Sequence, residues 1–230
     1  KWCQPNYNSV VATFCHNLHI GKKLEVHQPD RILSLAYIDD VVSALVKRIK
    51  RQDSRVCFCE VEPKYDISLK ELKDTLVGFH DCRKNISVPA VGEGLARALY
   101  STYASYIGED QLQVPLVKHV DSRGCFTEIL KTKDSGQFSF FTAKAGVMRG
   151  GHYHHSKTEK FLVVAGEAKF ELQHVLDHRV VEFSVSASVS ALIDVPPGWT
   201  HQITNVGKDD LIVFVWANEV FDGMRPDTFV

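Results

Sequence analysis

The stretch from Glu159 to Val175 reads EKFLVVAGEAKFELQHV, an apolar run followed by a glycine and a run in which apolar and polar residues alternate. A period of two is typical of β-strands, and a glycine between two such runs marks a turn. Similar segments surround it on both sides: RGCFTEILK, GQFSFFTAK, RVVEFSV, SALIDVPPG, HQITNV and DLIVFVWANE. We therefore predict that the chain ends in a compact all-β domain, a sandwich or jelly roll.

The first hundred residues have a different period. Apolar residues recur there at three- and four-residue spacing, which predicts amphipathic helices over residues 8–18, 38–49 and 67–79. Asp39 and Ser68 stand where N-caps belong. Short extended pieces are expected at residues 21–27 and 31–35. We predict an α/β piece over residues 1–108 and the β domain over 109–230.

Composition limits the class of protein. At 230 residues, 44% hydrophobic, 24% charged and with a net charge of -1, the chain has no excess of basic residues for binding nucleic acid. No apolar run approaches the roughly 18 residues of a membrane span, and no signal peptide is visible. Six cysteines without a CxxC pair suit a reducing cytoplasm. Because the sequence begins without Met, we expect a fragment of a longer protein.

Three histidines occur within four positions in the segment GGHYHHSKTEK, residues 150–160. On a strand, His152 and His154 would share one face, with Tyr153 and His155 on the other. A tight turn would then bring Glu159 onto the same face, and His201 follows a Pro-Gly turn elsewhere in the chain. Three imidazoles and a carboxylate suit Zn, Fe, Mn, Ni or Co.

An isolated His-x-His is more often part of a surface loop than of a metal site, but these spacings are specific. They resemble the two cupin motifs. The first motif corresponds to Gly146, five residues, His152-x-His154, four residues, Glu159, six residues and Gly166. The second corresponds to Pro196-x-Gly198, two residues, His201, three residues and Asn205. The glycine that opens the second motif is Ser190 here. The resemblance implies a cupin jelly roll with a metal at His152, His154, Glu159 and His201.

Two further segments, VDSRGCFTEILKT and VMRGGHYHH, resemble the RGxFxE and RGLHYQ segments of the dTDP-4-keto-sugar 3,5-epimerases. That resemblance implies that Arg123 and Arg149 hold a nucleotide diphosphate, and that Phe126 and Glu128 contact the base and ribose. It also implies a catalytic base at His152. Here His154 replaces the glutamine of that motif, so a metal would compete with the base for His152.

The segments KWCQPNYNSVVATFC, LSLAYIDDVV, LYSTYASY and WANEVFDGMRPDTF resemble the CapF-type capsular polysaccharide enzymes, over nearly the whole chain. Such enzymes join an extended short-chain dehydrogenase/reductase (SDR) domain to a zinc cupin. The resemblance implies a UDP-linked 2-acetamido-2,6-dideoxy-4-keto-hexose as substrate. Carbon 3 would be epimerised in the cupin and carbon 4 reduced with NADPH in the other domain, for capsule or O-antigen. It further implies a bacterial homodimer.

The nucleotide-binding part of such a reductase is not recognisable in this sequence. No GxGxxG follows a predicted strand, and GEGLA at residues 92–96 is interpreted as a loop. No lysine stands four residues after Tyr65, Tyr100, Tyr103 or Tyr106. Residues 1–108 then resemble only the substrate-binding subdomain of an SDR, with NADPH bound by the full-length enzyme alone. In PNYNS, Asn6 and Asn8 are weak candidates for substrate contact, and an N-cap role for Asn8 is at least as probable.

The general base stays open, with His152 and Lys160 as weak candidates. Strand alternation turns Lys160 away from Glu159. Two other functions also remain open. An iron cupin dioxygenase would suit the same ligands but leaves the two RG segments unexplained. A non-catalytic sugar-binding cupin would be expected to carry DNA-binding helices, and the first half has no basic face.

Overall fold

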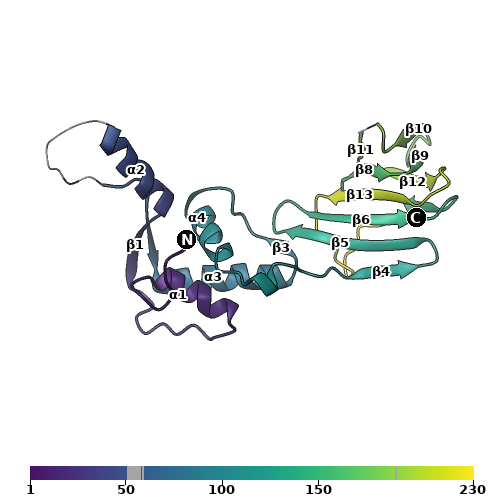
Figure 1. Cartoon of the computed structure of the whole chain (residues 1–230). Coiled ribbons are helices and arrows are strands. Elements are labelled where there is room, and N and C mark those ends of the chain that lie inside the picture. The colour runs from purple at the N-terminus through teal and green to yellow at the C-terminus, as the bar shows by residue number, and fades with distance from the viewer. Residues whose placement is uncertain (51–57, 59, 190) are drawn as a thin grey trace. The chain divides into compact units, whose positions relative to one another are not determined.

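The computed structural model describes residues 1–50, 58, 60–189 and 191–230, so Ser190 of the second cupin motif lies outside the described residues. The chain forms two compact units (Figure 1). The first comprises Lys1–Asn85 and Pro89–Val114, and the second comprises Ile86–Val88 and Pro115–Val230. The division therefore lies six residues beyond the boundary expected after residue 108.

The first unit packs helices beside a two-stranded sheet. Its elements are α1 (Val10–His19), β1 (Ile32–Ala36), α2 (Ile38–Lys50), β2 (Lys64–Ser68), α3 (Leu69–Lys84), α4 (Gly94–Ala104) and a 3₁₀ turn (Glu109–Gln111). Strands β1 and β2 are antiparallel. Leu72, Leu76 and Tyr103 are fully buried in the core that α1, α3 and α4 share. No helix in the described ranges is long and apolar enough to cross a membrane.

The helix starts differ in part from the prediction. Ser68 does cap α3, and a capping box with Glu71 completes the cap. Asp39, in contrast, lies inside the first turn of α2, because the carbonyl of Tyr37 already accepts the first helical hydrogen bonds. Its carboxylate instead accepts a hydrogen bond from Lys1 Nζ at 2.7 Å.

One predicted extended piece and one predicted loop also need correction. Residues 21–27 form no strand. The GEGLA segment is not wholly a loop, since α4 begins at Gly94, whose positive φ of 57° lets the chain turn into the helix.

The second unit is a sandwich of two β-sheets. Its strands are β3 (Ser87–Val88), β4 (Lys118–Asp121), β5 (Gly124–Thr132), β6 (Gln137–Ala143), β7 (Met148–His152), β8 (Glu159–Ala165), β9 (Glu167–His174), β10 (Val180–Ser186), β11 (Leu192–Val195), β12 (Trp199–Asn205) and β13 (Leu211–Ala217). One sheet has the order β10-β9-β12-β7. The other runs β11-β8-β13-β6-β5-β3, with β4 paired to the edge of β5. The pairings are antiparallel apart from the short β3–β5 contact.

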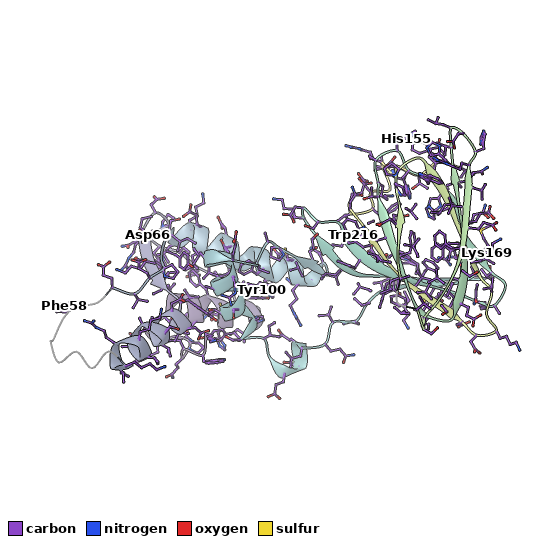
Figure 2. All side chains as sticks on the ribbon, turned by 90° about the horizontal axis from the view of Figure 1, so that it is seen from above. Phe58, Asp66, Tyr100, His155, Lys169 and Trp216 are labelled. Carbon is purple, nitrogen blue, oxygen red and sulfur yellow. The ribbon has the colours of Figure 1, made fainter. Side chains whose placement is uncertain are left out.

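The core of this unit lies between the sheets. Phe161 and Val213 from the larger sheet meet Phe170 and Ile203 from the smaller one, each at most 3% exposed. The alternating polar positions face outward, and Figure 2 shows Lys169 and Trp216 on opposite sides of the sandwich. The predicted β-rich, jelly-roll-like architecture is confirmed.

Candidate metal centre and substrate cavity

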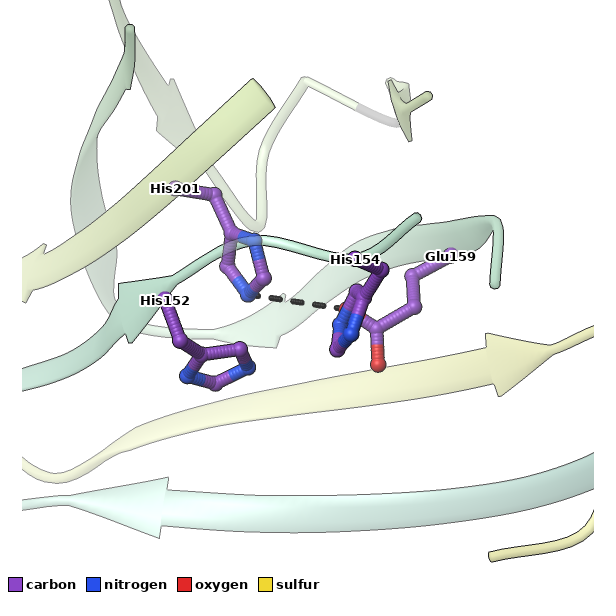
Figure 3. Close-up of side chains that lie close together, drawn as sticks. All are labelled: His152, His154, Glu159 and His201. Atoms are coloured by element: carbon purple, nitrogen blue, oxygen red, sulfur yellow. Dashed lines mark hydrogen bonds and ion pairs between the residues drawn. The ribbon is translucent and has the colours of Figure 1, made fainter. Parts of the chain in front are cut away.

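The candidate metal centre begins where β7 ends beside β12. His152 and His201 are cross-strand partners, and their ring centroids lie 4.6 Å apart (Figure 3). The pairing of β7 with β12 shifts register next to these two histidines, because Gly150 and Gly151 of β7, with φ of 94° and 85°, form a bulge. A side chain at Gly150 would overlap the carbonyl oxygen of His201. This close approach of two backbones explains the glycine at that position.

His154 and Glu159 complete the cluster from either side of the turn after β7. Glu159 is the first residue of β8, whereas His154 lies just beyond the end of β7. The Glu159 Oε2 atom is 3.2 Å from His154 Nε2 and 3.5 Å from His201 Nε2. One ligand atom from each of the four residues lies within 4.8 Å of all the others. The predicted set is thus brought together in one place.

Hydrogen bonding fixes the orientation of His154. Its Nδ1 lies 2.5 Å from the carbonyl oxygen of Asp227, which can only accept, so Nδ1 carries the proton. In the neutral ring, Nε2 then presents a lone pair to the carboxylate of Glu159. Two acceptors that face each other at 3.2 Å require a cation between them or a proton on the ring. This arrangement fits a metal ion.

The acid–base properties of the cluster agree with that fit. Burial lowers the pKa of His201 to about 4, and burial together with His154 lowers the pKa of His152. Burial alone would raise the pKa of Glu159, but the close contact with the His154 ring and the other neighbouring imidazoles outweigh it and lower the pKa. Neutral imidazole and ionised carboxylate are the forms that bind metals.

A cavity of about 360 Å³ opens over the cluster. Phe126, Glu128 and Arg149 line it together with the four predicted ligands. The Arg149 side chain is only 14% exposed, and among the described residues its NH1 atom has no hydrogen-bond partner. Its ion pair with Asp121 is long, 3.8 Å from NH1 to Oδ1. Burial, with Arg123 next, lowers the pKa of its guanidinium. A largely buried guanidinium in a cavity wall, held only by one long ion pair at NH1, suits an anionic ligand.

Arg123 does not line the cavity with Arg149. It is exposed, and its Nε and NH2 atoms donate to Asp121 Oδ2 at 3.0 and 2.6 Å. These bonds lower the pKa of Asp121 to about 2. The two arginines therefore share one carboxylate, with Arg149 inward and Arg123 outward.

Other predicted site residues lie away from the cavity. Lys160 pairs with Asp194 and is 40% exposed, as the strand alternation predicts. Asn8 does not cap α1, because Ser9 accepts the hydrogen bond from Ala12 N at 3.2 Å. A separate cavity of about 240 Å³ in the first unit is lined by Ser9 but not by Asn6 or Asn8.

Three residues near the cluster were missed by the sequence reasoning. Lys157 and Glu219 line the cavity, and Lys157 is 6% exposed with its Nζ donating to the Pro226 carbonyl at 3.1 Å. Asp227 binds the turn after His154. No local motif marks these positions, since each depends on segments about 60 to 70 residues apart.

Comparison with known proteins places this geometry in context. Residues 119–229 match the family described as the polysaccharide biosynthesis C-terminal domain. Over 229 residues the chain is 49% identical to a Pseudomonas aeruginosa protein named UDP-2-acetamido-2,6-beta-L-arabino-hexul-4-ose reductase, and it spans 62% of that protein's length.

Solved structures of CapF also match the whole of this chain. The capsular polysaccharide assembling protein CapF from Staphylococcus aureus matches all of this chain with a TM-score of 0.92 and 38% identity, and 67% of its own chain is covered. CapF with the inhibitor 3-isopropenyl-tropolone matches all of the chain with a TM-score of 0.92 and 39% identity, covering 66% of that chain.

Proposed function

This chain belongs to the family of the capsular polysaccharide assembling protein CapF, and from that premise we propose that its β unit is a metal-dependent 3-epimerase of a UDP-linked 4-keto sugar. The sugar would be a 2-acetamido-2,6-dideoxy-hexos-4-ulose, made for capsular polysaccharide or O-antigen. The first unit would be the substrate-binding part of an SDR-like reductase. In the full-length enzyme that reductase would use NADPH to reduce carbon 4.

One observation carries the proposal. Three imidazoles and a carboxylate converge in a 360 Å³ cavity whose wall also holds the largely buried guanidinium of Arg149, with no hydrogen-bond partner for NH1 among the described residues. A metal site next to an anion site suits a substrate with a carbonyl at one end and a diphosphate at the other. Phe126 in the same wall offers an apolar face for the nucleotide base.

Epimerisation next to a ketone removes the proton from carbon 3 and returns a proton to the opposite face. A divalent ion held by His152, His154, Glu159 and His201 would supply a Lewis acid for the ketone oxygen. The ammonium of Lys157 reaches the cavity from the other end of the same turn, and it adds positive charge where the enolate oxygen develops.

The cavity also holds carboxylates that are not in the cluster. Glu128 is paired with Lys131 at 2.8 Å, whereas Glu219 has no ion pair among the described residues. We therefore propose Glu219 as the group that exchanges the carbon 3 proton, in place of His152 and Lys160.

The test is deuterium incorporation at carbon 3. The metal-loaded chain would be incubated in D₂O with the UDP-linked 4-keto sugar and without NADPH, and the sugar analysed by mass spectrometry and proton NMR. We expect one deuterium at carbon 3, because the proposed reaction needs no nicotinamide.

Matched variants identify the source of that exchange. His154→Ala should lose both metal and exchange, whereas His155→Ala should keep both, because the His155 ring faces Phe229 at 4.3 Å and not the cavity. Metal-loaded protein without any exchange would rule out the epimerase. Substrate-dependent oxygen uptake by the iron-loaded protein would instead favour a dioxygenase.

A further inference from the structure

The segment Pro226–Phe229 closes over the turn that follows β7. Phe229 and Tyr153 form a two-way backbone bridge, with Tyr153 N to Phe229 O at 2.8 Å and Phe229 N to Tyr153 O at 3.0 Å. Their rings are 5.6 Å apart between centroids. The bridge thus joins the C-terminal segment to the residue between His152 and His154.

Asp227 is the centre of this contact. Its Oδ1 accepts a hydrogen bond from His155 N at 3.0 Å. Its Oδ2 accepts from Ser156 N at 2.9 Å, Lys157 N at 2.8 Å and the Ser156 hydroxyl at 2.9 Å. Burial raises the pKa of this carboxyl, but these donors outweigh burial and hold the pKa well below its usual range. One carboxylate therefore satisfies three consecutive backbone N–H groups.

The backbone carbonyl of Asp227 contacts the side chain of His154, at the start of the same turn. Its carbonyl oxygen lies 2.5 Å from His154 Nδ1, and this contact decides which ring nitrogen faces Glu159. The carbonyl is aimed at the ring by a backbone with a positive φ of 39°. Such a conformation is uncommon outside glycine, asparagine and aspartate.

We infer that Asp227 is a positioning residue of the candidate metal centre. Its carbonyl holds His154 in the tautomer that presents Nε2 to the metal, and its carboxylate fixes the turn that carries His154 to Glu159. This inference rests on the proposed metal site. Partners behind metal-bound histidines typically contribute about 10- to 100-fold in metal affinity.

Two substitutions test the carboxylate part of this role, and both keep the backbone carbonyl at residue 227. Asp227→Gly removes the carboxylate and tolerates the positive φ, so backbone strain does not confuse the result. Asp227→Asn keeps one side-chain oxygen for Ser156 and Lys157 but places an amide against the N–H of His155, and it should show a smaller loss. Asp222→Gly is the matched control, because Asp222 lies shortly before this segment, is exposed, and its side chain accepts a hydrogen bond from Met224 N at 2.9 Å.

The experiment measures zinc affinity of the full chain by competition with a chromophoric chelator. We expect Asp227→Gly to bind zinc about 10- to 100-fold more weakly than the unchanged chain, Asp227→Asn to fall between them, and Asp222→Gly to be unchanged. Cobalt-loaded Asp227→Gly should also show altered d–d absorption bands, because a misplaced imidazole changes the ligand field. A loss of fold alone would not produce altered bands in a protein that still holds the metal.

The outcomes are distinguishable. An unchanged chain that binds no metal overturns the proposed metal centre and this inference with it. Tight zinc binding by the unchanged chain with equal affinity in both Asp227 variants overturns the positioning role alone. Thermal unfolding of the zinc-free proteins identifies a variant that does not fold, and in that case the Asn variant decides.

Discussion

Replacement of Arg149 tests whether the cavity wall binds a diphosphate. Arg149→Met keeps the aliphatic stem and removes the charged guanidinium, whose central carbon lies 5.2 Å from the centroid of the Phe141 ring. The guanidinium is nearly buried and NH1 has no hydrogen-bond partner, so its removal should cost the free protein little stability. A hydrogen bond to a charged group typically contributes about 1.5–3 kcal/mol. We expect UDP to bind roughly 10- to 100-fold more weakly.

Isothermal titration with UDP measures the effect, and Arg123→Met is the control. Because Arg123 is exposed and held by Asp121, its loss should weaken UDP binding by less than about threefold, the effect of a solvated charge pair. Zinc content should be unchanged in both variants. The reasoning is refuted if Arg149→Met binds UDP as tightly as the unchanged chain, or if it weakens binding of the 4-keto sugar without UDP to the same extent.

Three more predictions follow from the fold and the site. Burial lowers the pKa of His201 to about 4 from its usual 6.5, so between these pH values the unfolded chain binds a proton that the folded chain does not. The free energy of unfolding of the metal-free protein should therefore fall as the pH drops from 6.5 to 4, by up to about 1.4 kcal/mol per pH unit. Denaturant titrations at several pH values measure this, and His201→Gln should show a smaller change of unfolding free energy with pH. Gly150→Ala should destabilise the protein by more than Gly151→Ala in thermal unfolding, because both have a positive φ but only the first would overlap His201; equal losses would mean that strain alone matters. Fluorescence titration should show no saturable NADPH binding to this chain, since it contains no recognisable phosphate-binding loop, and a micromolar dissociation constant would contradict that reading.

Much of the β unit could be predicted from local pattern. Strand alternation places Phe161 and Phe170 in the core and Lys160 outside it, because a side chain's face depends only on its position along the strand. The spacing of His152, His154 and Glu159 likewise predicts their convergence, since the short turn that joins β7 of one sheet to β8 of the other leaves few other arrangements. Arg149 reaches the cavity despite that alternation through the bulge at Gly150.

Other features of the candidate site depend on contacts between segments that are distant in the sequence. Arg123 and Arg149 look equivalent in their motifs, but only the structure shows that Asp121 holds one of them at the surface. Lys157 lies in a polar turn, where a solvated lysine is the usual expectation. Its burial depends on the Pro226 carbonyl, 69 residues away. No periodicity in the sequence encodes such a pairing.

The bridge between Tyr153 and Phe229 has a practical consequence for preparing this protein. Any affinity tag fused directly after Val230 would begin one residue from the backbone that holds the His154 turn. A polyhistidine tag at that end would also bring competing imidazoles within reach of the cluster and distort zinc stoichiometries.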